Sequence, residues 1–184
     1  MDNGENSYRR YLDGNDQGME ELIRDYKDGL LLYLNKYVQS LYLAEECVQE
    51  TFIRLAIKKP KFRGNSSFKT WLYVIARNVT ISFLRKEKSR NTVPLEDADE
   101  ISSKADLERD YLKEEQKVLL HRALERIKLE YQQVLWLTFF DGVRNDEAAK
   151  IMKKTKKQIE NLLYNAKKAL RAEMEREGYQ YEGL

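Results

Sequence analysis

Apolar residues in the first ninety positions recur at helical spacing. They return every three or four residues over 19–42 and again over 43–57, which places them on one face of each helix. A proline and a glycine then interrupt the pattern, and a third run occupies residues 68–88. Ser66 or Ser67 can cap that third helix, because both directly precede its first apolar residue. Three long helices are therefore predicted in this half.

The helical pattern fades over residues 91–110, where Pro94 stands among many acidic side chains. We interpret this stretch as a linker. Helical spacing returns over 111–128 and in a short helix over 131–138. Gly142 then supplies the left-handed turn that ends the short helix.

Two further helices complete the pattern. The first covers 146–152 with Asn145 as its expected N-cap, and the second starts after Thr155 and runs past Leu170. Only the turn 153–155 separates them. Two helices joined by so short a turn are typical of a helix-turn-helix.

The composition agrees with a helical fold. Among 184 residues there are 8 glycines and 2 prolines, too few for a loop-rich β-sandwich or a glycine-cradled nucleotide site. Charged residues make up 35% of the chain and the mean hydropathy is −0.73, which indicates small hydrophobic cores. We therefore expect an all-α protein of two small helical domains, 1–90 and 112–184, joined by a flexible acidic linker over 91–111.

Cysteine and histidine are too rare for several kinds of site. Cys47 and His121 each stand alone, so neither an internal disulfide nor a zinc site of histidines and cysteines is expected. His121 sits in a helical run, where a solvated side chain is the simpler interpretation. Neither a membrane-spanning stretch nor a secretory signal is recognisable. We expect a cytoplasmic protein without metal, cofactor or small-molecule substrate, and not an enzyme.

Positive charge is unevenly distributed. The net charge is only +2, yet basic residues gather in the three clusters 58–63, 85–90 and 153–171. Separate basic clusters on a nearly neutral chain favour a polyanionic partner that is touched at several places. Lysine-rich helix faces that are merely solvated explain the same clusters equally well.

The last helix has a long polar face. Ile159, Leu163 and Ala166 share the face expected to pack inward. Long donors on the opposite face can reach phosphates and base edges in the major groove of DNA. These outward residues are Lys156, Lys157, Glu160, Asn161, Tyr164, Asn165 and Lys168.

The stretch 61–73 mixes basic, aromatic and small polar residues. Aromatic rings stack on unpaired bases while lysine and arginine hold the backbone, so this mixture suits single-stranded nucleic acid. The alternative assigns Phe68 and Trp71 to the core, and for Trp71 that holds in part. Phe62, in the loop before the helix, is harder to explain as a core residue.

Three short runs in the first half resemble the N-terminal domain of bacterial RNA polymerase sigma factors. They are VQETF at 48–52, FRG at 62–64 and FKTWLYVIARN at 68–78. Their order and spacing, followed by a linker and a helix-turn-helix, are similar to the two-domain sigma factors of the extracytoplasmic-function group. The resemblance covers about residues 18–90 and 112–172.

The resemblance implies three surfaces. A carboxylate-rich helix face would bind the clamp helices of the polymerase, although a solvated acidic face is the plain alternative; its residues are Glu45, Glu46, Gln49, Glu50 and Thr51. The loop and following helix would open the −10 promoter element and hold a flipped base through Phe62, Arg63, Phe68, Lys69, Tyr73, Arg77 and Asn78. Trp71 belongs to the same −10 surface, and Arg85, Lys86 and Lys88 would hold the adjoining backbone. The helix-turn-helix would read the −35 element through Thr155, Lys156, Lys157, Glu160, Asn161, Tyr164, Asn165 and Lys168.

The resemblance also implies partners. A sigma factor binds core RNA polymerase and promoter DNA, and it catalyses nothing itself. An anti-sigma factor, often membrane-tethered, usually holds such a protein inactive. The acidic linker would thread the RNA-exit path of the polymerase, or else act as a plain flexible spacer.

Some positions depart from the family pattern. Lys153 and Lys154 stand in the turn where a glycine and an apolar residue are usual, and Glu160 and Asn165 occupy positions that are often basic. A promoter sequence therefore cannot be transferred from a relative. A stand-alone DNA-binding regulator explains the second half but leaves 48–78 without a role. An enzyme acting on nucleic acid lacks a suitable carboxylate or histidine cluster.

Overall fold

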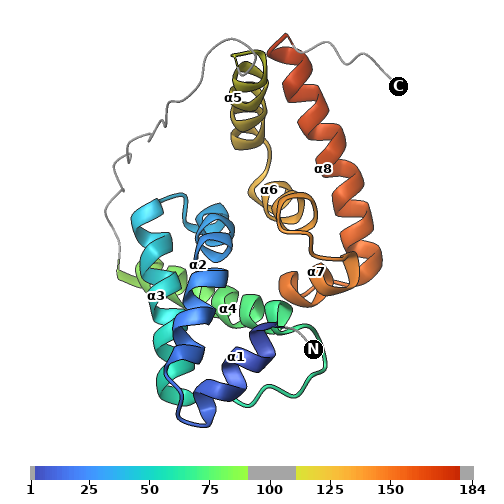
Figure 1. Cartoon of the computed structure of the whole chain (residues 1–184). Helices are drawn as coiled ribbons and strands as arrows, with labels where there is room; N and C mark the ends of the chain where they lie inside the picture. The colour runs from blue at the N-terminus through green and yellow to red at the C-terminus, as the bar shows by residue number, and fades with distance from the viewer. Residues whose placement is uncertain (1–2, 91–110, 179–184) are drawn as a thin grey trace.

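The computed structural model describes residues 3–90 and 111–178, and within these ranges it contains helices and loops but no strand. Figure 1 shows α1 to α4 gathered in one half and α5 to α8 in the other. The all-α prediction is confirmed. The predicted linker over 91–111 lies, except for its last residue, outside the described residues. The first half holds α1 (Asn3–Leu12), α2 (Gln17–Val38), α3 (Leu41–Lys58) and α4 (Phe68–Arg90); the second holds α5 (Tyr111–Arg126), α6 (Leu129–Leu135), a π-helical turn η1 (Trp136–Phe140), α7 (Asn145–Met152) and α8 (Lys156–Arg176).

The N-terminal half is built on the apolar faces of α2, α3 and α4. Leu30 and Leu34 of α2, Leu55 of α3 and Leu72 of α4 are all fully buried. Burial of one apolar face per helix is the main stabilising contribution to a bundle of this size. The periodicity of residues 19–57 predicted these faces correctly.

The sequence did not predict α1. This short helix packs against α2 and α4, and its Tyr8 is buried against the rings of Phe68 and Trp71, with ring centres 5.5 and 5.4 Å away. The Tyr8 hydroxyl donates a hydrogen bond to the carbonyl of Pro60 at 2.7 Å. Helix α1 therefore fixes the loop between α3 and α4.

Several helix ends differ from the prediction. Helix α2 ends at Val38 rather than at residue 42, because Gln39 turns into the left-handed region with a φ of 51°. Helix α3 starts at Leu41, where the Ser40 hydroxyl accepts a hydrogen bond from the Leu43 amide. Of the two predicted caps of α4, Ser66 and Ser67, it is Ser67 whose hydroxyl accepts a hydrogen bond from the Thr70 amide, at 3.2 Å.

The helix-turn-helix is confirmed as α7 and α8. Its first helix starts one residue earlier than predicted: Asn145 lies inside α7, and Arg144 is the capping residue without a side-chain bond. Lys153 adopts a left-handed φ of 55° in the turn. Thr155 and Gln158 form a reciprocal capping box that begins α8. Gly142, with a φ of 66°, supplies the expected left-handed turn after η1.

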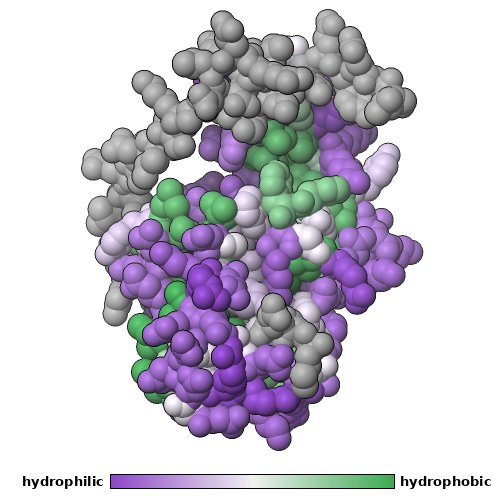
Figure 2. Space-filling model, in the orientation of Figure 1, coloured by the Kyte–Doolittle hydropathy of each residue, from purple (hydrophilic) through white to green (hydrophobic). Residues whose placement is uncertain are grey.

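The two halves contact each other directly. Helix α7 packs on α4, and α6 packs on α2. The Gln133 side chain donates to the carbonyl of Lys36 at 3.2 Å, although these residues are far apart in the sequence. Hydrophilic residues cover most of the face that Figure 2 shows, with hydrophobic residues exposed in a few patches. Among the described residues, the helices are all too short or too polar to cross a membrane.

Candidate functional site

The acidic face of α3 contains four of the five residues predicted to bind polymerase. Glu45 and Gln49 are exposed, while Glu46 and Glu50 are half-buried. Glu50 Oε1 accepts from Arg54 Nε at 2.6 Å, so one of its oxygens is already paired. Thr51, the fifth predicted residue, is buried.

Thr51 faces inward. Its side chain is fully buried, and its hydroxyl donates to the backbone carbonyl of Cys47 at 2.7 Å within the same helix. Thr51 therefore supports the packing of α3 and does not form part of the exposed face. Burial raises the pKa of the neighbouring Cys47 thiol, which is consistent with an unreactive core cysteine.

An apolar groove runs beside this acidic face, between α2 and α3. Its volume is about 450 Å³, and Ile53 within it is 49% exposed. Polar side chains stand on both walls, so the groove offers apolar contact surrounded by hydrogen-bonding groups. It is lined by Ile23, Lys27, Leu31, Glu45, Val48, Gln49, Phe52 and Ile53.

The loop between α3 and α4 rests on a cluster of aromatic rings. Phe62 is half-buried and lies 5.5 Å from Phe68 and 5.3 Å from Trp71, measured between ring centres. Phe62 is therefore partly a packing residue, contrary to the sequence-based interpretation. Arg63 and the adjacent Gly64 are exposed at the tip of the loop, beyond the cluster.

Helix α4 carries the remaining residues predicted to hold the −10 element. Phe68 has no exposed surface, so its ring supports the loop from within and cannot itself contact DNA in this structure. Trp71 is half-buried in the same cluster. The Arg77 guanidinium lies over the ring of Tyr37 at 5.9 Å, and Asn78 is half-buried beside it in sequence.

The end of α4 is basic and open to solvent. Arg85, Lys86 and Lys88 are all exposed. Such side chains can hold a phosphate backbone without reading its sequence.

Lys69 and Tyr73 meet the C-terminal half. Lys69 Nζ lies 2.6 Å from Asp141 Oδ1 and 2.7 Å from the Asp141 backbone oxygen, which follows η1. Tyr73 is only 1% exposed, and burial together with the Asp141 charge and hydrogen bond raises the pKa of its phenol well above the usual range. Two of the predicted DNA-binding residues therefore contact the same carboxylate, and Tyr73 is also packed in the core, with its ring centre 5.4 Å from that of Tyr33.

A second carboxylate covers the first turn of α4. Glu147 Oε1 accepts hydrogen bonds from the hydroxyls of Ser67 at 2.6 Å and Thr70 at 2.8 Å. Burial raises the pKa of Glu147, but these two hydrogen bonds and the charge of Arg144 outweigh it, so the pKa lies below its ordinary value. Glu147 is therefore held as an anion.

The outward face of α8 matches the prediction. All seven predicted outward residues are exposed, and Tyr164 is 71% exposed, whereas Ile159, Leu163 and Ala166 are buried. Thr155 is also exposed, with its hydroxyl engaged in the capping box. A continuous polar face opposite a buried face suits insertion into a DNA groove.

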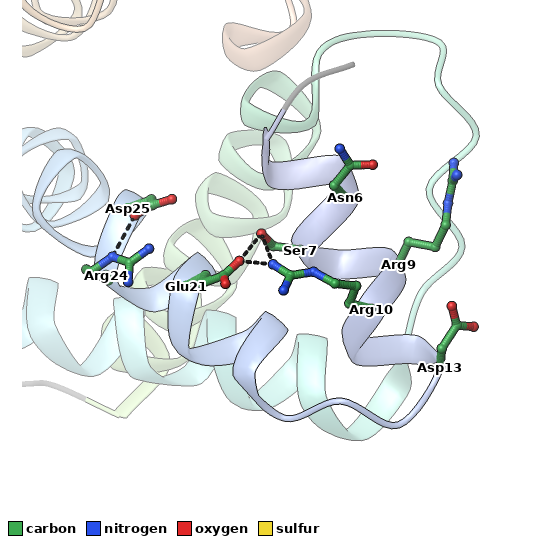
Figure 3. Close-up of a pocket in the computed structure, with 8 residues that line it drawn as sticks. All are labelled: Asn6, Ser7, Arg9, Arg10, Asp13, Glu21, Arg24 and Asp25. Carbon is green, nitrogen blue, oxygen red and sulfur yellow. Dashed lines mark hydrogen bonds and ion pairs between the residues drawn. The ribbon is translucent and has the colours of Figure 1, made fainter.

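A polar hollow between α1 and α2 is closed by its own charges. In Figure 3, Ser7 and Arg10 both point toward Glu21. The Ser7 hydroxyl donates to Glu21 Oε2 at 2.6 Å, and Arg10 forms an ion pair with the same carboxylate. The Ser7 hydrogen bond, with help from Arg10, lowers the pKa of Glu21. Ser7, Arg10 and Glu21 thus pair with one another, and this hollow gives no argument for a bound ligand.

Comparison with protein families decides the identity of the chain. The family described as Sigma-70 region 2 matches residues 22–90, and the family described as Sigma-70, region 4 matches residues 117–170. Each match falls on one helical half. The chain belongs to the sigma-70 family. A stand-alone regulator would need only the second match, so that alternative is removed.

Known sigma factors resemble this chain over most of its length. It is 28% identical to RNA polymerase sigma factor YlaC of Bacillus subtilis (strain 168), over 85% of this chain and 91% of that protein. It is 26% identical to ECF RNA polymerase sigma factor SigX of the same strain, over 82% of this chain and 80% of SigX. These relatives support its placement in the extracytoplasmic-function group.

Solved sigma-factor structures share the fold. CnrH, in complex with the cytosolic domain of CnrY, superposes with a TM-score of 0.66 at 18% identity, over 95% of this chain and 99% of CnrH. The sigma factor RpoE of Bartonella quintana, in complex with the anti-sigma factor NepR, also gives a TM-score of 0.66, at 20% identity over 85% of this chain and 96% of RpoE.

The comparisons establish the general function. The protein is a sigma factor that directs RNA polymerase to specific promoters for transcription initiation. Sigma factors are not enzymes. Within the part of the chain that the structure describes, histidine, cysteine and acidic side chains form no group of three that could hold a metal ion.

Sequence reasoning missed the contacts between the halves. Nothing in the sequence pattern singles out Asp141 or Glu147 as a contact of the first half. The sequence predicts Ser67 as a possible cap and gives no role to Thr70. Their spacing in the sequence carries no signal, because about eighty residues separate Glu147 from its two hydroxyl partners.

Proposed function

We propose that this sigma factor uses three surfaces in initiation. The acidic face of α3 and the groove beside it bind core RNA polymerase. The loop after α3 and the exposed side chains of α4 open the −10 element, and the outward face of α8 reads the −35 element. The observation that carries the proposal is that one chain presents two nucleic-acid-type surfaces, one on each helical half, beside a separate apolar groove.

Fewer residues of the loop and α4 would contact the −10 strand than the sequence predicted. Exposed Arg63 and the basic end of α4 would hold the strand, and Lys69 would contact it once its bond to Asp141 is broken. Tyr73 is buried against Tyr33 and would support α4 from within. Buried Phe68 would support the loop from behind. Stacking and backbone contacts together suit an unpaired strand.

We place the protein in the cytoplasm with core polymerase, promoter DNA and an anti-sigma factor as partners. RpoE, which shares this fold, was solved with its anti-sigma factor NepR, and such a partner for this chain is an expectation of the family. Recovery of polymerase alone in a pull-down from the native cell would argue against it.

The experiment is transcription in vitro from fragmented genomic DNA of the source organism. Core polymerase is supplied with and without the protein, and transcript starts are sequenced. Discrete starts that need the protein are expected, and they define both promoter elements. Binding of core without any new start would contradict the proposed use of the −10 and −35 surfaces.

The groove gives a sharper test of polymerase binding. Ile53→Asp puts a carboxylate into the apolar groove, and burying an unpaired charge should weaken core binding about tenfold or more. Ile57→Asp is the matched control, because Ile57 lies on the same helix, is 76% exposed and does not line the groove. Equal affinities of both variants, measured by fluorescence anisotropy with purified core, would refute the assignment.

A further inference from the structure

The loop between α3 and α4 has few bonds of its own. It joins Lys58 to Phe68, and among the described residues the backbone groups of 60–66 form no backbone–backbone hydrogen bond. If such a segment became ordered only when DNA binds, the loss of conformational entropy would lower the affinity. A loop that is proposed to hold the −10 strand therefore gains from support outside itself.

Helix α1 supplies that support through two tyrosine hydroxyls. Tyr11 donates at 3.2 Å to the carbonyl of Ala56, one of the last four carbonyls of α3, which have no partner further along the helix. Tyr8 donates at 2.7 Å to the carbonyl of Pro60, directly after the left-handed Lys59 that ends α3. The Lys59 ammonium lies over the Tyr11 ring, 5.0 Å from its centre. The start of the loop is thus bound to α1 on both sides of the point where α3 ends.

Close packing fixes the position of α1. A Cβ at Gly4 would lie 2.6 Å from the Phe68 ring. A Cβ at Gly18 would overlap the carbonyl oxygen of Ser7, so glycine is what allows the approach at both places. The Tyr8 ring packs on Phe68 as well, with 5.5 Å between the ring centres. Figure 3 shows the loop, in pale green, passing beside α1. Helix α1 therefore gives the loop a firm point of attachment.

We infer that α1 holds the loop in the shape that receives the −10 strand, so that Tyr8 and Tyr11 are positioning residues for promoter opening. The inference rests on the proposed function of the loop. Tyr8 is 2% exposed, so it acts through the carbonyl it holds and not by touching the strand. The groove proposed to bind polymerase is lined by α2 and α3, and the −35 surface lies on α8. Loss of the two hydroxyls should therefore weaken −10 binding and leave the other two surfaces intact.

The variant that tests the inference is Tyr8→Phe with Tyr11→Phe in the full chain. Both replacements keep the ring and remove only the hydroxyl, so the aromatic cluster stays filled. The control is Ser7→Ala with Thr80→Val, which also removes two hydroxyl donors from the N-terminal half and leaves net charge unchanged. Ser7 donates to Glu21 of α2 at 2.6 Å, and Thr80 donates within α4 at 3.0 Å, so neither bond reaches the loop.

The order of the loop is read first without DNA. Trypsin cleaves after Lys61 and Arg63, which are both exposed, only when the loop loosens enough to enter its active site. Mass spectrometry at early times should show these two bonds cut about threefold faster or more in the test variant than in the control. Equal rates would show that the hydroxyls do not hold the loop, and would overturn the inference.

Binding is then read in the holoenzyme. The probe is a fluorescein-labelled fragment of a promoter mapped as described above, with a duplex −35 element and a single non-template −10 strand. The test variant should bind it about fivefold more weakly than the control, because a loop ordered in only part of the molecules lowers the apparent affinity by that fraction. Affinities for core polymerase and for the −35 duplex alone should not change. Equal weakening of all three would reduce the effect to general instability and overturn the inference.

A scan of the −10 strand separates positioning from stability. An abasic site replaces each −10 nucleotide in turn, and the flipped base is the one whose removal weakens the wild-type holoenzyme most. The test variant should lose about threefold less at that position than the control does, because a loosened loop gains less from the base. Identical losses at every position in both variants would overturn the inference.

Arg63→Ala separates the inference from the function it rests on. Arg63 is exposed at the tip of the loop and is proposed to hold the strand, so its removal should also weaken −10 binding. Weaker binding by Arg63→Ala without any effect of the tyrosine variant would overturn the inference and leave the proposed function intact. No effect of Arg63→Ala and no position sensitive to an abasic site would overturn the assignment of the loop to the −10 strand, and the inference with it.

Discussion

At the scale of single residues, Tyr8 stabilises the loop after α3 through both its ring and its hydroxyl. Its ring completes the aromatic cluster under the loop after α3, and its hydroxyl holds the Pro60 carbonyl at 2.7 Å. Burial raises the pKa of this phenol to about 12, so it remains a hydrogen-bond donor throughout the range in which proteins are studied. The position of Phe62 and Arg63 therefore depends on a helix that lies outside the family match to residues 22–90.

Replacing Tyr8 should separate these two contributions. Tyr8→Phe keeps the ring and leaves the Pro60 carbonyl without its partner, which should lower the free energy of unfolding by about 1 kcal/mol. Tyr8→Ala also removes a buried ring, at about 3–5 kcal/mol. Urea denaturation followed by circular dichroism measures both. Tyr11→Phe is the control, since its 3.2 Å bond to Ala56 is longer and its side chain is less buried. A loss in Tyr8→Phe no larger than in this control would contradict the role of the hydroxyl.

At the scale of elements, local signals decided which helices the sequence could predict. Helix α8 was predictable because its apolar period and its Thr155 cap both lie within the element. Helix α1 was not, because it is short and its stability comes from contacts made by Tyr8 with residues some sixty positions away. The same reason hid the partners of Asp141 and Glu147. Burial of Thr51 and Phe68 shows that a family motif identifies a position without saying which way its side chain points.

In the turn of the helix-turn-helix, a lysine adopts a left-handed backbone conformation. Lys153 has a φ of 55° at the end of α7, and the amide of Lys154 bonds back to the carbonyl of Ala149 at 2.9 Å, as in a Schellman motif. A left-handed lysine is strained and a glycine is not, so Lys153→Gly should raise the free energy of unfolding by about 0.5–1 kcal/mol. Thermal unfolding measures this change.

Lys154→Gly is the matched control for that turn. Its backbone φ is not positive, so glycine brings only added freedom of the unfolded chain and loss of the bond from Lys154 to Glu130. A decrease of roughly 0.5 kcal/mol is expected there. If both variants were stabilised or both destabilised, the left-handed conformation would not be the cause.

At the scale of the whole molecule, the buried apolar residues of the two halves form one cluster, and polar contacts between α4 and α7 add to it. The contact between α4 and α7 rests on carboxylates, hydroxyls and lysines. Such bonds gain little beyond what water offers to the separated groups. The apolar residues that the two halves share in this cluster therefore contribute more to holding them together than these polar bonds do.

Acid should open the molecule through Glu147. The pKa of Glu147 lies below its ordinary value of 4.5 because Ser67 and Thr70 donate to its charged form, despite the opposing effect of burial. A lowered pKa means that this carboxylate stabilises the contact between α7 and α4 fully above pH 4.5 and loses that effect as the pH falls through the lowered value. The radius of gyration from small-angle X-ray scattering should therefore rise as the pH falls below about 4.5, while circular dichroism still reports folded helices. In Glu147→Gln the radius should already be larger at neutral pH and should change less with acid. Equal pH dependence in the wild type and this variant would show that other carboxylates govern the opening.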